Sequence, residues 1–171
     1  MFIIKPITKE EATGELKTIY KIIKKKLGFV PPHFELLGTL DISKLKDFLQ
    51  YNEYMTNHPK IDADILPILR LYIATKECRS YCIGLNTKLL LAKGIDVKNI
   101  NDNLSSIVFK DNQKLLLDKT IKAIYDTENF GADDLGELYK ADFSDKDFFD
   151  ILGYTINFMS NSKIIEVYLR K

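Results

Sequence analysis

The sequence is poor in the residues that build disulfide frameworks and zinc sites. It has two cysteines and two histidines among 171 residues. Two cysteines are too few for a disulfide-stabilised scaffold, and only His33 and His58 are present to complete a four-ligand zinc site with them. We therefore expect no metal centre, and no residue pattern indicates a cofactor.

The sequence also lacks an excess of charge of either sign. Its 25 basic and 24 acidic side chains nearly cancel, so no overall field attracts nucleic acid or an anionic membrane surface. The first residues lack the apolar region of a secretory signal, and no stretch reaches the roughly 18 apolar residues of a membrane span. We expect a cytoplasmic protein that binds neither nucleic acid nor a membrane.

A third absence is the alternation of apolar and polar residues that is typical of β-strands. Apolar residues recur instead at helical spacing, and 46% of the chain is hydrophobic, enough for one sizeable core. The fold class that we predict is all-α. We expect a single domain over residues 1–171, built as an antiparallel helical bundle.

Capping residues set the expected helix ends. Thr8 and Glu11 have capping-box spacing and predict a helix that starts at Thr8 and is closed by Gly28. The other expected helices cover residues 33–38, 41–58 with Asp41 as cap, 64–76, 81–93, a short segment capped by Asp96, 111–124 with Asp111 as cap, a short segment capped by Asp133, and a last helix opened by Ser144. A stripe on that last helix is expected to pack in the core; its members are Phe148, Phe149, Leu152, Ile156 and Met159.

The stretch from Asp64 to Gly94 contains both cysteines and the longest apolar run. Pro67 is compatible with a helix there because it falls in the first turn, where its missing N–H has no intrahelical partner to lose. Arg70 is the main polar residue of an otherwise buried helix. The polar cluster from Lys76 to Ser80 predicts a break, followed by a second helix that ends at Gly94.

Cys78 and Cys82 are the candidate catalytic residues. If Cys82 lies in the first turn of the second helix, the helix dipole and Arg79 favour its thiolate, whereas Glu77 and burial oppose it. On one continuous helix the two Cβ atoms would lie about 5 to 6 Å apart, too far for a disulfide without distortion. The alternative is that both cysteines are small hydrophobic residues of the core.

Several segments taken together resemble the alkylhydroperoxidase D and carboxymuconolactone decarboxylase superfamily, especially its uncharacterised peroxidase-related members. They are LGFVP at residues 27–31, the buried helix over 64–76, Tyr81-Cys82 with its helix ending in Gly94, and FSDKDFFDILGYTINFMSNS at 143–162. The resemblance covers most of the chain. It implies an all-α fold and a homo-oligomer, as a dimer, trimer or hexamer.

The resemblance also implies a site. Active members carry a CxxC pair, a histidine four residues after the second cysteine, and a glutamate about twelve residues before the first. Aligned on Cys82, this chain has Arg79 at the first cysteine position, with Cys78 displaced by one residue, Asn86 at the histidine position and Pro67 at the glutamate position. The proton relay is therefore absent in its familiar form, and Arg79, Tyr81, Asn86 and Glu77 are expected to support the cysteines.

Three functions follow from this resemblance. The first is a thiol-dependent peroxidase of the antioxidant type, in which Cys82 reduces a small hydroperoxide and Cys78 or an external thiol donor resolves the product. The second is a non-catalytic member that keeps the fold as a small-molecule-binding or assembly protein. The third is the lactone decarboxylase branch, for which no histidine near the centre supplies a base.

Overall fold

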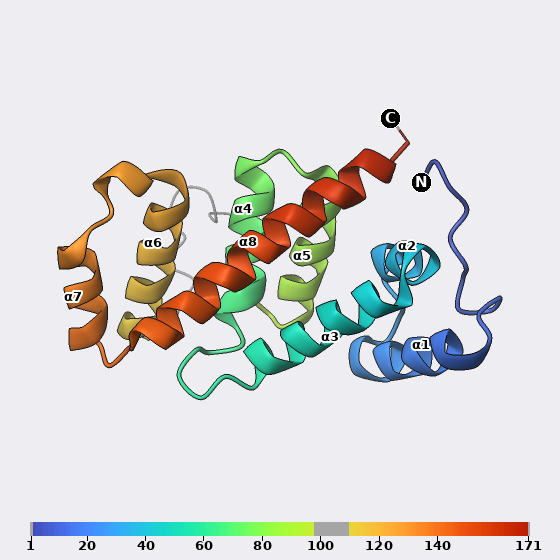
Figure 1. Ribbon diagram of the computed structural model, residues 1–171, viewed down its shortest axis with the longest axis horizontal. Helices are drawn as coiled ribbons and strands as arrows, with labels where there is room; N and C mark the ends of the chain where they lie inside the picture. Colours follow the sequence, from blue (N-terminus) through green and yellow to red (C-terminus); the bar gives the residue numbers. More distant parts are fainter. Residues whose placement is uncertain (1, 98–109, 171) are drawn as a thin grey trace. The chain divides into compact units, whose positions relative to one another are not determined.

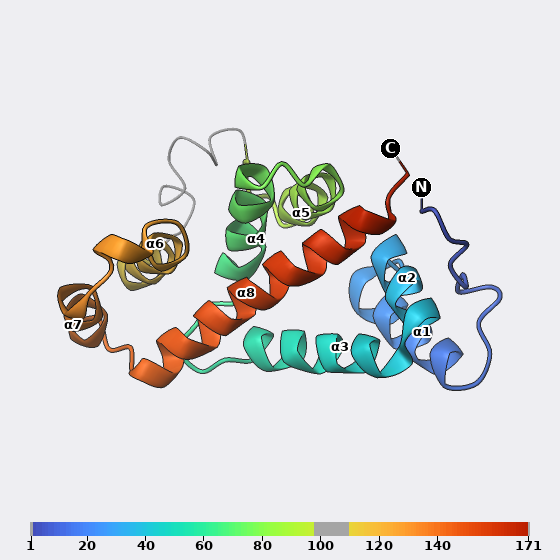
Figure 2. The ribbon, with the colours of Figure 1, turned by 45° about the horizontal axis from the view of Figure 1, so that its top comes forward.

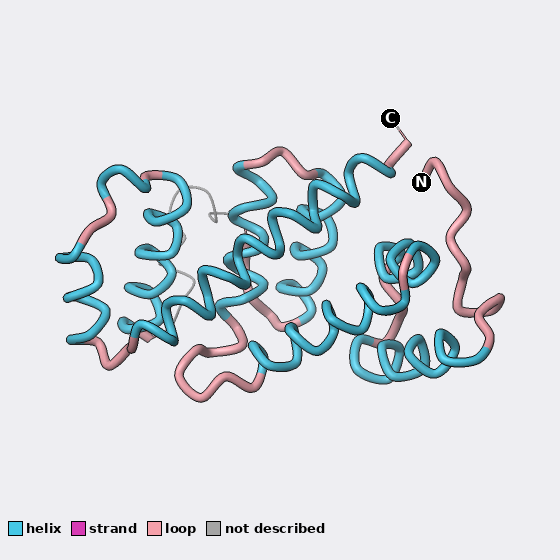
Figure 3. The backbone as a smooth tube through the Cα atoms, viewed as in Figure 1, coloured by secondary structure: helices cyan, strands magenta, loops and turns pink. Residues whose placement is uncertain are grey.

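A computed structural model of the chain describes residues 2–97 and 110–170, and these form α-helices, one short 3₁₀ helix and no strand. The α-helices are α1 (Gly14–Leu27), α2 (Pro32–Leu40), α3 (Ile42–Thr56), α4 (Ile65–Lys76), α5 (Ser80–Ala92), α6 (Asp111–Tyr125), α7 (Ala132–Lys140) and α8 (Asp145–Tyr168), with the 3₁₀ helix η2 (Thr127–Asn129) before α7 (Figures 1 and 3). The all-α prediction is confirmed. The short helix expected after Asp96 lies outside the described residues.

The chain divides into two compact units, Met1–Asn52 with Ile164–Lys171, and Glu53–Lys163. The expectation of a single domain stays a prediction. No helix of the described residues is long and apolar enough to cross a membrane.

The first unit is built on α1, α2, most of α3 and the end of α8. Its buried core consists of Ala12, Leu16, Tyr20, Ile23, Val30, Phe34, Leu37 and Leu45. Gly38 lets α2 approach this core closely, because a Cβ atom there would lie 2.6 Å from a Leu16 methyl carbon and 2.7 Å from the Tyr20 hydroxyl. The two ends of the chain meet in the same unit, where the Ile3 N–H donates to the Tyr168 carbonyl over 2.8 Å (Figures 1 and 2).

The expected start of the first helix at Thr8 is wrong. Thr8 and Glu11 do form the reciprocal capping bonds, with the Thr8 N–H donating to the Glu11 carboxylate over 3.1 Å. They cap only an isolated turn, because Gly14 follows in the left-handed region at φ 54 and α1 starts there. The other end is as expected, since Gly28 closes α1 at φ 81.

The second unit contains the hairpin of α4 and α5, which pack directly against each other, and the pair of α6 and α7 (Figure 1). Helix α4 is buried almost throughout its first ten residues, and Pro67 lies in its first turn as the sequence predicts. The side chains that it buries are Ile65, Leu66, Pro67, Ile68, Leu69, Leu71, Ile73 and Ala74. Burial of each large apolar side chain stabilises the fold by about 2 kcal/mol, so α4 is the central element of this unit.

Two of the predicted caps form at the start of their helices, Asp41 and Ser144. The Asp41 carboxylate accepts the N–H groups of Ser43 and Lys44 at the start of α3. At α8 the Ser144 N–H donates to the Asp147 carboxylate over 2.7 Å, and the Asp147 N–H donates back to the Ser144 hydroxyl over 3.3 Å. These reciprocal bonds satisfy donors that the first helical turn leaves without partners.

Two expectations about the carboxyl-terminal half are wrong. Asp111 and Asp133 lie inside α6 and α7 rather than at their caps, and at α7 the Asp134 carboxylate accepts the Gly131 N–H instead. On α8 the expected core stripe is divided, because Phe149 is 72% and Ile156 is 53% exposed. The residues of α8 that are buried are Phe148, Ile151, Tyr154, Thr155, Ser162 and Ile165, with the two aspartates Asp147 and Asp150.

Candidate functional site

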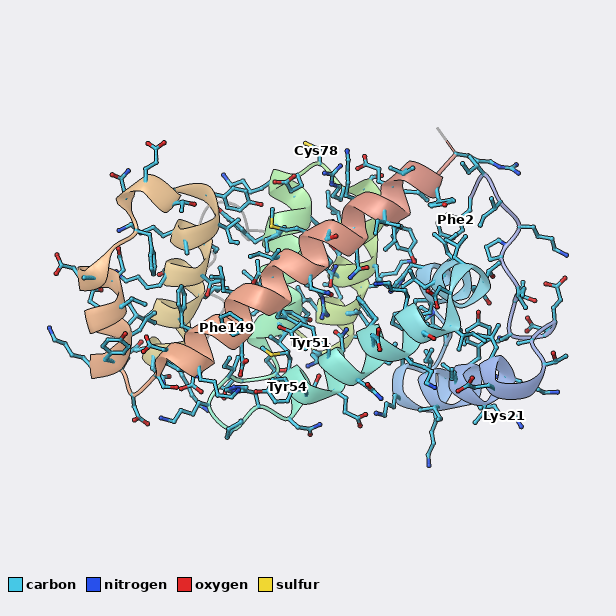
Figure 4. The ribbon with its side chains drawn as sticks, viewed as in Figure 1. Phe2, Lys21, Tyr51, Tyr54, Cys78 and Phe149 are labelled. Carbon is cyan, nitrogen blue, oxygen red and sulfur yellow. The ribbon has the colours of Figure 1, made fainter. Side chains whose placement is uncertain are left out.

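Both cysteines lie at the turn that joins α4 to α5. Cys78 is in the turn itself and is exposed, whereas Cys82 is the third residue of α5 and is only 4% exposed. Figure 4 shows the Cys78 side chain directed outward from the connection between the two helices. The predicted break between Lys76 and Ser80 is confirmed, and it leaves the two thiols in different environments.

The turn is closed by two backbone hydrogen bonds. The Arg79 N–H donates to the Ala74 carbonyl over 2.8 Å, and the Cys78 N–H donates to the Thr75 carbonyl over 3.1 Å. This is the Schellman pattern, in which the residue that follows the C-cap adopts the left-handed conformation and is usually glycine; here the C-cap is Glu77. Cys78 adopts it at φ 54, at a conformational cost of about 1 kcal/mol for a residue with a Cβ atom.

The Cys82 thiol is held in its protonated form. Burial raises its pKa to about 11, and the positive charges of Arg79 and Arg70 lower it by less than burial raises it. At pH 7 only about one Cys82 in ten thousand is then a thiolate. The helix terminus and the arginines therefore do not by themselves activate this thiol.

Asn86 connects the backbone of Cys82 to Arg70. Its side-chain amide donates to the Cys82 carbonyl over 2.8 Å, and its side-chain oxygen accepts the Arg70 Nε–H over 2.9 Å. Arg70 also donates to the hydroxyl of Tyr154, which is buried on α8. We call Arg70, Cys82, Asn86 and Tyr154 the cysteine cluster.

The other predicted supporting residues lie at the edge of this cluster. Arg79 is largely buried, and its guanidinium lies 3.4 Å from the Glu77 carboxylate. Glu77 also accepts the hydroxyl of Tyr125 over 3.3 Å, which ties the turn to α6. Tyr81 is the second residue of α5 and is partly buried.

Sequence reasoning did not place Arg70 or Tyr154 in the site. A signal for Arg70 was present, since it is the one charged residue between Ile65 and Thr75 of an apolar helix. No local signal identifies Tyr154, because it reaches the cluster from α8, more than sixty residues along the chain from Asn86.

A second polar cluster joins the end of α3 to the start of α8. The Asp150 carboxylate accepts the Tyr54 hydroxyl and the Lys146 ammonium, each over 2.5 Å, and lies 3.3 Å from His58 Nε2. Asp147 lies 3.6 Å from the same nitrogen. We call Tyr54, His58, Lys146, Asp147 and Asp150 the histidine cluster.

The tautomer of His58 follows from its neighbours. Its Nδ1 accepts the backbone N–H groups of Lys60 and Ile61, each over 3.2 Å, so the neutral ring carries its proton on Nε2 and donates it toward Asp150. Burial raises the pKa of Asp150, but the bonds from Lys146, Tyr54 and His58 outweigh this and lower it overall. His58 therefore holds the α3–α4 connection against α8.

No group of three or more His, Cys, Asp or Glu side chains in the described parts of the chain is arranged to hold a metal ion. His33 lies in the first unit, with its ring against Phe34 at a centroid distance of 4.1 Å. Both histidines are buried.

Two solved structures show which fold this arrangement belongs to. An uncharacterized peroxidase-related protein from Silicibacter sp. TM1040 superposes with a TM-score of 0.75 at 18% identity, over 96% of this chain and 85% of that one. An "alkylhydroperoxidase AhpD core", an uncharacterized peroxidase-related protein from Ralstonia eutropha JMP134, superposes with a TM-score of 0.74 at 16% identity, over 96% and 92%. The chain has the AhpD-like fold. No protein-family model and no curated protein matches the sequence.

The structure shows where Pro67 and Asn86 lie, two of the residues at which this chain differs from the pattern given by the resemblance. Pro67 is buried in the first turn of α4 and offers no acid or base. Asn86, which stands at the position of the histidine in the resembled pattern, is 2% exposed and donates its amide to the Cys82 carbonyl. The surroundings of Cys82 therefore contain two cations, Arg70 and Arg79, and no general base next to the thiol among the described residues.

Proposed function

We propose that this AhpD-like protein is a thiol-dependent oxidoreductase that reduces hydroperoxides through Cys82, with Cys78 or an external thiol resolving the product. The observation that carries the proposal is the pair of thiols around the first turn of α5, the buried one beside two guanidinium groups. Cations near the sulfur lower the pKa of a thiol and stabilise the negative charge that develops on the leaving oxygen.

The reaction balances with the two thiols and a hydroperoxide. The Cys82 thiolate attacks the terminal peroxide oxygen, an S–O bond forms, the O–O bond breaks, and the alcohol leaves with a proton. The sulfur is oxidised by two electrons to a sulfenic acid. The Cys78 thiol then displaces water to form a disulfide, which an external thiol reduces by exchange.

The geometry makes the first step slow. Asn86 accepts and donates hydrogen bonds but takes no proton, so the Cys82 proton passes to water or to the substrate. The second step requires the turn to open, because Cys78 is exposed and Cys82 is buried. Opening the turn breaks backbone bonds that include those from Arg79 to Ala74, from Cys78 to Thr75 and from Ile83 to Arg79.

The test is mass spectrometry of protein alkylated before and after a short pulse of hydrogen peroxide or tert-butyl hydroperoxide. It reads Cys78 and Cys82 in separate peptides. Oxidation of Cys82 followed by a reversible bond to Cys78 supports the proposal, and Cys78→Ser should then trap Cys82 as a sulfenic acid. If both thiols react no faster than free cysteine, the peroxidase proposal fails.

One observation favours a second function, a non-catalytic protein that binds a small molecule. The pKa of Cys82, raised to about 11 by burial, leaves a thiol that behaves as an apolar core residue at neutral pH. The Cys82→Ala variant separates the two functions. It abolishes peroxide consumption if the protein is a peroxidase, and it leaves ligand binding intact if the protein is a binding module.

We also propose that the chain self-associates through α8. Phe149 and Ile156 are separated by two helical turns, so they share one face of α8, and both are more than half exposed (Figure 4 labels Phe149). Large exposed apolar side chains on one helix face are typical of an interface. Analytical ultracentrifugation of the wild type and of the double variant Phe149→Ser/Ile156→Ser tests this. The wild type should sediment as an oligomer and the double variant as a monomer. A wild type that sediments as a monomer would contradict the proposal.

A further inference from the structure

Arg70 is a cation in an apolar helix, and its partners are neutral. Its Nε–H donates to the Asn86 side-chain oxygen, and another N–H donates to the Tyr154 hydroxyl, over whose ring the guanidinium also lies at 5.9 Å. In the part of the chain that the structure describes, Arg70 forms no ion pair with a carboxylate. A partly buried charge without an opposite charge is costly unless something compensates it.

A second cation lies near the thiol. The guanidinium of Arg79 lies 3.4 Å from the Glu77 carboxylate, and its charge, like that of Arg70, acts on Cys82. Arg79 is thus held at the turn by an acidic side chain, whereas Arg70 donates to an amide and a phenol.

The hydrogen bonds fix Arg70 beside the thiol-bearing turn of α5. Asn86 contacts the Cys82 carbonyl with one end of its amide and Arg70 with the other, so a single side chain separates the guanidinium from Cys82. Tyr154 fixes a second edge of the guanidinium from α8. A planar guanidinium held in this way presents its remaining N–H groups in a fixed direction, as carboxylate recognition requires.

We propose that Arg70 binds the carboxylate of a small-molecule ligand beside Cys82. This inference rests on the proposed function, and together they define the substrate class as hydroperoxides that carry a carboxylate. Arg70 is then a specificity-determining residue: it neutralises its own charge with the anionic group of the substrate and places the rest of the molecule toward the thiol.

The experiment compares two alkylating reagents that differ in charge. Iodoacetate carries a carboxylate and iodoacetamide is its neutral counterpart, so the ratio of their rates at Cys82 cancels the thiolate fraction. Cys78 in the same molecule is the internal reference. We expect the iodoacetate-to-iodoacetamide ratio to be about tenfold higher at Cys82 than at Cys78, and to fall to the Cys78 value in Arg70→Gln.

The control variant is Lys88→Gln, which removes an exposed cation from α5 and should leave the ratio unchanged. Arg70→Lys keeps the charge without the planar fork and should retain only part of the preference. Equal ratios in wild type and Arg70→Gln would overturn the inference. Circular dichroism and gel filtration establish that the variants are folded.

A second measurement applies where burial keeps both reagents from Cys82. Hexanoate at about ten times its dissociation constant should raise the Tm of wild type by about 3 °C, and hexanamide should not. Arg70→Gln should lose the response to hexanoate. No difference between the two compounds in wild type would overturn the inference.

The outcomes separate this inference from the proposed function. A carboxylate preference that depends on Arg70, with no peroxide reaction at Cys82, supports an anion site in a binding protein and overturns the assignment of a hydroperoxide substrate. Peroxide reaction at Cys82 without any carboxylate preference supports the peroxidase and overturns the role of Arg70.

Discussion

The cysteine cluster and the histidine cluster both bury polar groups against α8, but their charges differ. In the histidine cluster, two aspartates face Lys146 and His58, and Asp150 accepts three hydrogen bonds. In the cysteine cluster, Arg70 meets only an amide and a phenol. The first is electrostatically complete, whereas the second has a positive charge left over.

This difference indicates that the histidine cluster stabilises the fold, whereas the cysteine cluster is the one that we propose binds a ligand. The pKa values of the two clusters move in opposite directions: hydrogen bonds hold the pKa of Asp150 down against the effect of burial, whereas burial holds the pKa of Cys82 up. The aspartate is thus stabilised in its charged form, and the thiol in its neutral form. We therefore expect the charge-balanced histidine cluster to contribute to the free energy of unfolding, and the cysteine cluster, whose charge is unbalanced, to bind an anion.

The largest expected effect comes from breaking the complete cluster. Asp150→Ala removes the acceptor shared by Tyr54, Lys146 and His58 and should reduce the free energy of unfolding by about 3 kcal/mol. The matched change in the cysteine cluster, Arg70→Met, should cost less than about 1 kcal/mol, since it also removes an uncompensated charge. Urea unfolding measures both, and equal losses would contradict the comparison.

The next effect appears at alkaline pH. The folded-state pKa of Cys82 lies near 11 and its ordinary value is 9.0, so the unfolded chain loses this proton first as the pH rises. The stability linked to the proton is complete below pH 9 and is lost through pH 11, for a total of about 3 kcal/mol, of which about 2 kcal/mol is lost by pH ~10.5. Unfolding of wild type and Cys82→Ala between pH 7.5 and about 10.5 measures it; parallel curves would show that the thiol is not protected.

A smaller effect is expected from supplying the missing base. Asn86→His places an imidazole one helical turn after Cys82, and alkylation of Cys82 by iodoacetamide at neutral pH should become about tenfold faster. Asn86→Ala is the control, because it removes the bridge to Arg70 without adding a base. The prediction fails if both variants change the rate equally.

The smallest effect concerns the turn that leads into the cysteine cluster. Cys78→Gly relieves the left-handed conformation and should stabilise the protein by about 1 kcal/mol. The matching turn at the end of α5 has Gly94 at φ 76, with bonds from Gly94 to Leu91 and from Ile95 to Leu90. Gly94→Ala should lose a similar amount, and thermal unfolding that moves both variants in the same direction would contradict the conformational argument.

Much of the fold follows from local sequence. Apolar spacing, Pro67 in a first turn, the caps at Asp41 and Ser144 and the stop at Gly94 are all properties of a few adjacent residues, and the structure confirms them. The start of α1 was missed because Gly14 interrupts a capping box that is itself correctly formed. The exposed part of the α8 stripe was missed because periodicity shows that a face is apolar and not what covers it.

The cysteine cluster could be predicted only in part, because only some of its contacts join residues that are close in sequence. Cys82 and Asn86 are one turn apart in a helix, so their proximity follows from sequence. Arg70 and Tyr154 join them from α4 and α8, and contacts between distant segments are not visible in local patterns. The charge of Arg70 within an apolar run was the one local indication that something on another helix faces it.

The contrast in exposure between the two thiols also makes the native chain a spectroscopic tool. A maleimide dye or nitroxide spin label applied briefly at neutral pH should attach at Cys78 alone, without any substitution, because Cys82 is only 4% exposed. The label would sit on the corner between α4 and α5, where its mobility reports each opening of the turn. Conformational opening could then be timed separately from the chemistry at Cys82.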